Sequence, residues 1–148
     1  MGFFSAIENS ASGLMAQRLR LDLISNNIAN INTPNYQRQV PVLLARGSDA
    51  GFSNVMNQSI NANSGTGVQV GAVINDQTAG TLEYDPTSPF ASKNAATGVP
   101  VGYIRQSNVN IVSEMTDMLA ASRAYEANVT MMNATKSMAT KALEIGKG

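Results

Sequence analysis

The stretch IVSEMTDMLAASRAYEANVTMMNATKSMATKAL (residues 111–143) has side chains at alternating spacings of four and three that form an almost unbroken apolar line. This spacing is the a/d pattern of a coiled-coil helix, sustained here for more than four heptads. It predicts one long helix that packs along one side. The predicted seam consists of Ile111, Met115, Met118, Ser122, Tyr125, Val129, Met132, Lys136, Ala139 and Leu143.

The residues around this segment indicate where the helix begins and ends. Asn110 or Ser113 can serve as the N-cap, and Gly146 marks the stop. Lys136 lies on the seam, where a lone charge either fixes the packing register or extends its ammonium group to water. The later half has a second row of side chains, so it expects more than one neighbour. That row is Met131, Thr135, Met138, Ala142 and Ile145.

A second helix is predicted from Ser5 to about Asn30 by the same kind of spacing. One row, with Ile24 beside it, has a period of seven residues: Ile7, Leu14, Leu21 and Ile28. Met15, Leu19 and Leu23 form another row on a different face. Two terminal helices of this kind are expected to pair as a coiled coil, and their further apolar faces would remain exposed in a monomer.

The segment SNNIANINTPNYQRQ (25–39) comes directly after the first helix and contains five asparagines. Asparagine amides cap a helix end without a charge to desolvate. Pro34 ends the helix, and Asn35 is suited to a left-handed turn. Tyr36 can then anchor the exit of the chain. We therefore expect a joint between the first helix and the middle of the chain.

The middle of the chain is rich in glycine and proline and predicts short strands at 68–75, 81–85 and 101–106. Turns are expected at 76–80 and 85–89, and loops at 47–67 and 91–100. The predicted fold class is α+β, with two long terminal helices pairing as a coiled coil and a small irregular β-rich middle. The expected division is 1–34 for the first helix and joint, 35–107 for the middle, and 108–148 for the second helix.

The composition argues against most chemistry. Lys plus Arg equals Asp plus Glu, ten of each, so no basic footprint for nucleic acid is present. The chain has no Cys and no His, which removes the usual nucleophile, the neutral-pH base and most transition-metal ligands. No cofactor or small-molecule substrate is expected.

Two groups of charged residues are candidates for a site. Asp76, Glu83 and Asp85 are clustered carboxylates, and a weak cation site there is much less favoured than a solvated strand edge. The basic residues of the N-terminal third are expected to pair with carboxylates of a neighbouring molecule, such as Glu114, Asp117 or Glu126. These basic residues are Arg18, Arg20, Arg38 and Arg46. The residues therefore predict an assembly subunit and not an enzyme.

Several motifs resemble those of the bacterial flagellar axial proteins. SNNIANINTPNY (25–36) is similar to their N-terminal signature, although the family usually has glycine where this chain has Asn35. NVN, EM, SRAYEANV and NATKSM within 108–148 resemble their C-terminal signature. GVQV (67–70), LEYDPTSPFA (82–91) and GYI (102–104) match the middle of a proximal rod protein in the same order. The resemblance to the flagellar basal-body rod family thus covers nearly the whole chain.

This resemblance implies a structural rod subunit that transmits motor torque to the hook. Its helices would form the inner layer around an export channel, with the β-rich middle outside. The implied partners are copies of itself, other rod proteins and the flagellar type III export apparatus, with the membrane-embedded base ring as a further candidate. The implied location is the rod across the periplasm, reached without a cleavable signal peptide. Residues 1–21 lack the basic start and apolar block of such a signal.

The residues expected at assembly interfaces combine helix rows with the joint. They are Ile7, Leu14, Leu21, Ile24, Ile28, Asn30, Pro34, Asn35, Tyr36, Met115, Met118, Tyr125, Val129, Met132 and Lys136. Three alternatives remain open at this point. One is another subunit of the rod family, and another is a cytoplasmic helical binding or export-adaptor module. The third, an enzyme using Asp76, Glu83 and Asp85, is disfavoured because no base or nucleophile accompanies them.

Overall fold

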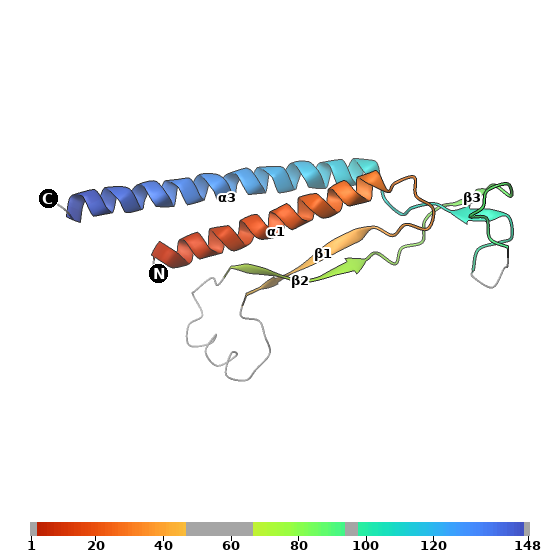
Figure 1. Ribbon diagram of the computed structural model, residues 1–148, viewed down its shortest axis with the longest axis horizontal. Coiled ribbons are helices and arrows are strands. Elements are labelled where there is room, and N and C mark those ends of the chain that lie inside the picture. Colours follow the sequence, from red (N-terminus) through yellow and green to blue (C-terminus); the bar gives the residue numbers. More distant parts are fainter. Residues whose placement is uncertain (1–2, 47–66, 94–97, 147–148) are drawn as a thin grey trace, which may run out of the picture.

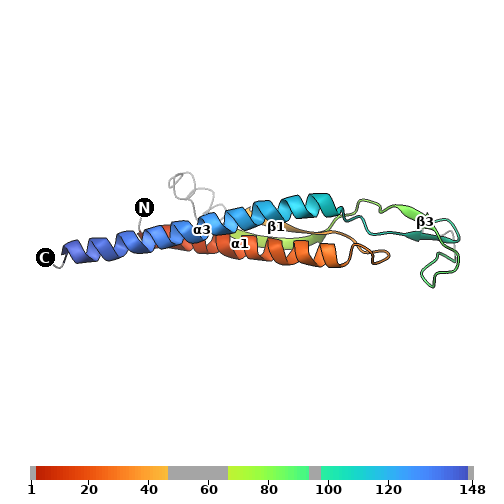
Figure 2. The same cartoon turned by 90° about the horizontal axis from the view of Figure 1, so that it is seen from above.

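The computed structural model describes residues 3–46, 67–93 and 98–146. Two helices, α1 (Phe3–Ala29) and α3 (Ile111–Gly146), run antiparallel along an elongated molecule (Figure 1). Strands β1 (Gln39–Ala45) and β2 (Val68–Asn75) run alongside α1. Strands β3 (Leu82–Tyr84) and β4 (Tyr103–Arg105) lie beyond the helices at one end (Figure 2). Terminal helices with small antiparallel sheets between them confirm the predicted α+β class.

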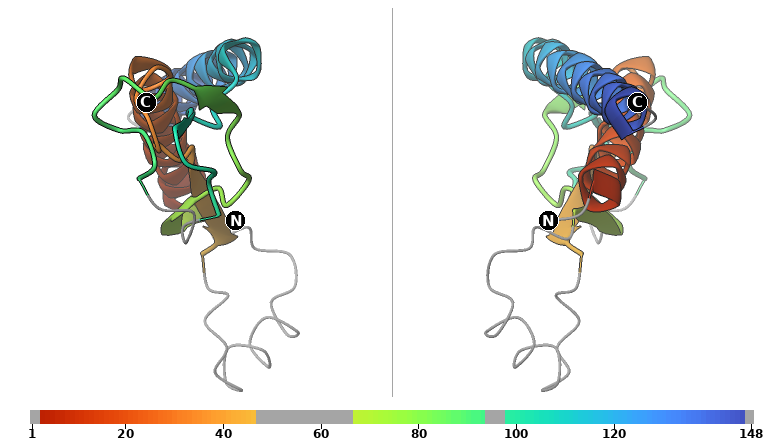
Figure 3. Two further views of the ribbon diagram at one scale, coloured as in Figure 1. Left: turned by 90° about the vertical axis from the view of Figure 1, so that its right-hand side faces the viewer. Right: turned by 90° about the vertical axis from the view of Figure 1, so that its left-hand side faces the viewer.

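Helix α1 lies between α3 and the β1–β2 sheet, as the end-on views in Figure 3 show. It contacts both neighbours, which explains why its sequence is apolar on more than one side. Helix α3 contacts only α1 among the elements of the described chain. No strand of the described chain therefore covers the other faces of α3.

The side of α3 that faces α1 is displaced by one residue from the predicted seam. The packing row has a period of seven and is small or polar: Glu114, Ala121, Asn128 and Thr135. Opposite it, a Cβ on Gly13 would lie 3.1 Å from the Asn128 amide nitrogen, and Ala16 is buried. Small residues let the helices approach closely. Bulky Met115 and charged Lys136 therefore lie beside the row, where both are exposed.

Helix α3 continues beyond the beginning of α1. Asn27 contacts Glu114 and Gly13 faces Asn128, so the paired residue numbers add to a constant value, as in an antiparallel pair. On this register Phe3 lies opposite about residue 138, and the last eight or so residues of α3, ~12 Å of helix, have no α1 beside them. Figure 1 shows this extension.

The β1–β2 hairpin pairs Gln39 with Asn75 and Ala45 with Val68, with a register shift between Val42 and Leu43. Strand β2 confirms the prediction at 68–75, whereas β1 was not predicted. Pro41 sits within β1, which is an edge strand, and this is one of the few strand positions that tolerate proline. The predicted loop 47–67 falls outside the described residues except for Gly67.

The second sheet pairs Leu82 with Arg105 and Tyr84 with Tyr103. The two tyrosine rings lie 5.1 Å apart at a tilt of 57°. Both strands are shorter than predicted. The predicted loop 91–100 is described at its two ends, where Val99 is buried, and residues 94–97 fall outside the described chain. In the described part of the chain, neither helix has the length and apolar character needed to cross a membrane.

Candidate assembly site and the polar joint beside it

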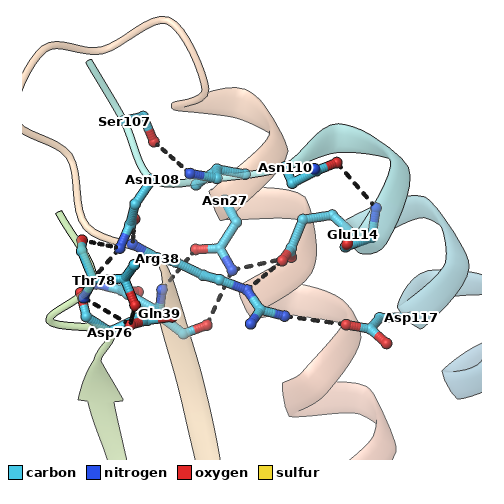
Figure 4. A network of polar contacts seen from close by, with 12 residues as sticks. Asn27, Arg38, Gln39, Asp76, Thr78, Ser107, Asn108, Asn110, Glu114 and Asp117 are labelled. Carbon is cyan, nitrogen blue, oxygen red and sulfur yellow. Dashed lines mark hydrogen bonds and ion pairs between the residues drawn. The ribbon is translucent and has the colours of Figure 1, made fainter. Parts of the chain in front are cut away.

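Asn27, near the end of α1, lies in the segment where the sequence predicts a joint and is the centre of a buried polar network (Figure 4). From here on, the joint means this polar network. Its amide oxygen accepts hydrogen bonds from the Gln39 backbone N–H at 2.9 Å and from the Tyr36 hydroxyl at 3.2 Å. Its amide nitrogen donates to the Gln39 carbonyl at 3.0 Å and to Glu114 Oε2 at 3.1 Å. One side chain thus satisfies both ends of its amide and ties α1 to β1 and α3.

Glu114, in the first turn of α3, is a fully buried carboxylate. Arg38 Nε donates to Glu114 Oε1 at 2.5 Å, and the same guanidinium reaches Asp117 Oδ2 at 3.1 Å. Burying a carboxylate is costly unless it is paired and hydrogen-bonded, and here both oxygens have partners. The N-terminal end of the helix dipole also favours a negative charge at this position.

Asn108 extends the joint to the end of β2. Its amide oxygen accepts the Arg38 backbone N–H at 2.7 Å. Its amide nitrogen donates to the carbonyls of Asp76 at 3.0 Å and Thr78 at 2.9 Å. The joint therefore joins both helices, the chain leaving α1 and the chain entering α3 (Figure 4).

Three ion pairs within the chain correct the prediction for two arginines of the N-terminal third. Arg38 pairs with Glu114 and Asp117 of its own chain, and Arg46 pairs with Glu8 at 2.7 Å. No local pattern reveals these contacts, because the fold brings together residues that are far apart in the sequence. Arg38 thus fixes the internal geometry of the chain.

The turn after α1 confirms two further predictions. Asn35 adopts a left-handed backbone with φ of 60°, and its N–H donates to the Arg105 carbonyl at 2.9 Å. Asn30 caps the helix end, because its side chain donates to the Asn26 carbonyl at 2.9 Å.

The predicted start of the second helix is confirmed as well. Asn110 is the N-cap of α3, with its amide oxygen accepting the N–H of Val112 at 3.0 Å.

The joint also changes the chemistry of Tyr36. Burial raises the pKa of its hydroxyl above the ordinary 10.0, and the negative charge of Glu114 raises it further. The proton stays on the oxygen at neutral pH and is donated to Asn27. The joint is thus suited to holding elements in place.

The three clustered carboxylates do not form one site. Asp76 accepts from Thr78, Asp85 accepts from Thr87, and Glu83 accepts from Gln106. The hydroxyl and N–H of Thr78 lower the pKa of Asp76, and those of Thr87 lower that of Asp85. The described residues contain no cluster of three acidic, His or Cys side chains that could hold a metal ion.

The residues predicted for assembly interfaces fall into three classes of exposure. Ile24 is buried against the neighbours of α1. The half-buried ones are Ile7, Leu14, Leu21, Ile28, Asn30, Pro34, Tyr36, Met118, Val129 and Met132. The exposed ones are Asn35, Met115, Tyr125 and Lys136. The structure brings Tyr36 into the joint, and a role of the others in contacts between subunits stays a prediction.

Further large apolar side chains are exposed outside the set of residues expected at assembly interfaces. Val112 and Leu119 flank Met115 on the first turns of α3, and Met131, Met138 and Ile145 line its later half. On β2, Val73 and Ile74 are exposed as well. The seven-residue period of Met131, Met138 and Ile145 was the signal for an outward row. Exposed rows of this size mark surfaces that bind other proteins.

A helix pair that leaves many large apolar side chains of α3 exposed, with β-rich structure alongside α1 and beyond one end of the helices, defines a structural subunit of a larger assembly. The sequence comparisons agree with this class. Residues 7–37 match the family model described as "Flagella basal body rod protein", and residues 101–145 match "Flagellar basal body rod FlgEFG protein C-terminal".

Curated relatives match over the full length of the chain. The flagellar basal-body rod protein FlgC of Bacillus subtilis is 40% identical over 159 residues, covering 99% of this chain and 100% of the relative. FlgC of Borreliella burgdorferi is 41% identical over 155 residues, covering 100% of both. FlgC of Salmonella typhimurium is 32% identical over 156 residues, covering 99% of this chain and 100% of the relative. The chain belongs to the FlgC family of flagellar basal-body rod proteins.

Proposed function

We propose that this chain is a structural subunit of the proximal flagellar rod that polymerises through its terminal helices and transmits torque from motor to hook. The observation that carries the proposal is the distribution of side chains on α3. Its inner row is small or polar, whereas two outer rows are large and apolar. The first outer row is Val112, Met115 and Leu119, and the second is Met131, Met138 and Ile145.

The two outer rows lie on different sides and different halves of the helix. Each therefore suits a different neighbour, as a subunit surrounded by copies and relatives requires. Burial of these side chains between subunits supplies the driving force for assembly. Coverage of both rows in the polymer removes a surface that a solitary monomer would leave open to water.

Torque transmission is supported by the joint. Segments 1–34 and 108–148 form the helical part in this proposal, and segment 35–107 forms the arm outside it. Asn27, Arg38 and Glu114 connect these parts through buried bonds whose donors and acceptors are satisfied on both sides. A saturated network resists rotation of the arm about the helices, because any rotation breaks several bonds at once.

The remaining parts of the proposal concern location and partners. The partners are further copies of this chain, other rod proteins, the flagellar type III export apparatus and the membrane-embedded base ring. The place is the rod across the periplasm, reached without a cleavable signal peptide. Membership in the FlgC family supports these assignments. The role needs no nucleic acid, cofactor or small-molecule substrate.

The test replaces Met131 and Met138 together with glutamine in a strain lacking the native protein. Both side chains are exposed, 60% and 63%, so the fold of the chain should be unchanged. We expect secreted, folded protein but no basal-body incorporation and no swimming. The matched control replaces Asn133 and Thr140 of the same helix with glutamine. Full motility of the methionine variant, or retention of the native chain in the cytoplasm of swimming cells, would contradict the proposal.

A further inference from the structure

A cavity of about 400 Å³ lies at the β3–β4 end of the molecule (Figure 1); we call it the basic cavity. The charged residues that line it are Lys93 and Arg105, and no carboxylate of the described chain lines it. Arg105 Nε is buried without a hydrogen-bond partner among the described residues. A buried cationic donor without an acceptor costs free energy. The basic cavity is therefore suited to a negatively charged group.

Backbone hydrogen bonds hold both sides of the basic cavity in place. Arg105 lies on β4, and its carbonyl accepts the N–H of Asn35 at 2.9 Å. On the other side, Ser92 donates its N–H to the Tyr103 carbonyl at 3.0 Å, and Lys93 follows directly in the chain. The backbone that carries the two cations is thus fixed before anything binds. A preorganised site of this kind loses little conformational entropy on binding.

The rest of the lining indicates what kind of anion fits. Phe90, Tyr103 and the buried Val99 also line the basic cavity. The Tyr84 ring lies 5.1 Å from the Tyr103 ring, and Tyr84 and Phe90 are 64% and 62% exposed. A water molecule occupies about 30 Å³ in the liquid, so a single free oxyanion would leave most of the cavity unfilled. The lining instead suits a carboxylate attached to an apolar group, and exposed aromatic rings beside an arginine are typical of the central contacts of protein interfaces.

A further copy of this chain is not suited to supply that carboxylate. Most of its carboxylates already accept a hydrogen bond or form an ion pair within the chain: Glu8, Asp76, Glu83, Asp85, Glu114 and Asp117. Each of the others has a basic residue three or four positions before it: Asp22 after Arg18, Asp49 after Arg46, Glu126 after Arg123 and Glu144 after Lys141. Such a segment would bring a further cation to a cavity that two cations already line. The carboxylate is therefore expected from a different protein.

We propose that the basic cavity binds an acidic side chain of a different protein, on a segment that has apolar residues beside the carboxylate and no basic residue near it. The carboxylate accepts hydrogen bonds from Arg105 and Lys93, and the apolar residues cover the rings of Phe90 and Tyr84. Charge complementarity selects the partner, and the apolar contact strengthens the binding. The inference rests on the proposed function for the presence of such a neighbour, whereas the cavity itself is complete in a single chain.

Nitrogen-15 NMR of the full-length chain tests the contact at the atom that carries it, because arginine Nε–H groups give their own signals. The probe is the peptide Gly-Phe-Glu-Leu-Gly, acetylated and amidated at its ends, and its control has glutamine in place of glutamate. We expect the glutamate peptide to shift the Arg105 Nε–H signal and to bind at least about tenfold more tightly than the glutamine peptide. The Arg38 Nε–H signal is the internal control and should not move, because this group already donates to Glu114.

Three variants with the same change of charge test the residues involved. Arg105→Gln should reduce binding of the glutamate peptide to the level of the glutamine peptide. Lys93→Gln, at an exposed residue, keeps the Arg105 signal and should weaken binding at least about threefold, and it decides the test if Arg105→Gln does not fold. Arg123→Gln, at an exposed residue of α3, is the control and should bind like the native chain. Equal binding of the two peptides by the native chain, or native binding by both cavity variants, overturns the proposal.

Two small anions and one further variant complete the test. If inorganic phosphate or acetate binds as tightly as the glutamate peptide, the basic cavity is a site for a free anion and the proposal is overturned. The chain with Met131 and Met138 replaced by glutamine should still bind the glutamate peptide, because both methionines lie on α3. Loss of swimming in that variant, together with no peptide binding by the native chain, would support the proposed function and overturn this inference alone.

Discussion

Replacing Arg38 with alanine should destabilise the fold strongly, because the change leaves a buried charge without its counter-ion. The guanidinium makes two ion pairs of contrasting environment. The Glu114 side chain is 1% exposed and the Asp117 side chain is 52% exposed, while Arg38 itself is 29% exposed. One residue therefore offers an internal comparison between a buried and a solvated pair.

The expected magnitudes depend on these exposures. Removing one partner of a buried ion pair costs about 3–5 kcal/mol, and we expect the lower end because Asn27 still donates to Glu114. Asp117→Ala removes only the solvated pair and should cost ~0.2–1 kcal/mol. In a chain of this length a loss of 3 kcal/mol lowers the melting temperature by about 6–12 °C.

The assay is urea unfolding followed by far-ultraviolet circular dichroism, because urea leaves ion pairs unscreened. The double variant Arg38→Ala/Glu114→Gln should be more stable than Arg38→Ala alone, since no buried charge remains in it. Two results would refute the reasoning. One is equal stability of Arg38→Ala and Asp117→Ala, and the other is absence of any rescue by Glu114→Gln.

Three further changes test single structural features. Gly80→Ala should lower the free energy of unfolding by about 3 kcal/mol, because the added Cβ would overlap the backbone carbonyl oxygen of Gln106. The control is Gly146→Ala, whose added Cβ has no atom within 4 Å. It should change the free energy of unfolding by less than ~1 kcal/mol in the same urea titration. Asn35→Gly should keep the melting temperature, whereas Asn35→Val should cost about 1–2 kcal/mol at a φ of 60°. Burial, and to a lesser extent the Glu114 charge, raises the pKa of Tyr36. The folded state therefore holds the hydroxyl proton more tightly than the unfolded state does. The resulting contribution of Tyr36 to stability is complete below the ordinary pKa of 10.0 and is lost as the pH rises through the folded pKa. The free energy of unfolding, measured between about pH 9 and 12, should show that decline in the native chain and a weaker decline in Tyr36→Phe.

The features that the sequence predicted correctly are those set by local patterns. The length of α3 is set by its heptads, its start by Asn110, and strand β2 by its β-branched residues. The left-handed turn at Asn35 reflects the tolerance of asparagine for positive φ. Each depends on residues within one or two turns of the chain.

The features that the sequence did not reveal depend on contacts across the chain. Arg38 and Glu114 are separated by 76 positions, and no local pattern indicates that they meet. Strand β1 contains Pro41, which argues against a strand until its edge position is known. The predicted seam of α3 lies one residue away from the observed packing row, because the four-three spacing indicates the period of the contact but not which row is innermost, whereas close helix approach selects Ala121 and Gly13.

That displacement bears directly on how the chain works as a subunit. Packing the exposed Met115, Met131 and Met138 against α1 would strengthen the monomer and remove the apolar surface that the proposed assembly uses between subunits. Small residues in the inner row keep the helix pair close, while the stability they forgo is supplied at the joint by Asn27, Arg38 and Glu114. Because those bonds are directional, they also fix where the arm points. In the proposed subunit, polar contacts at one end therefore hold the shape of the chain, and the apolar rows along the helix are left to bind its neighbours.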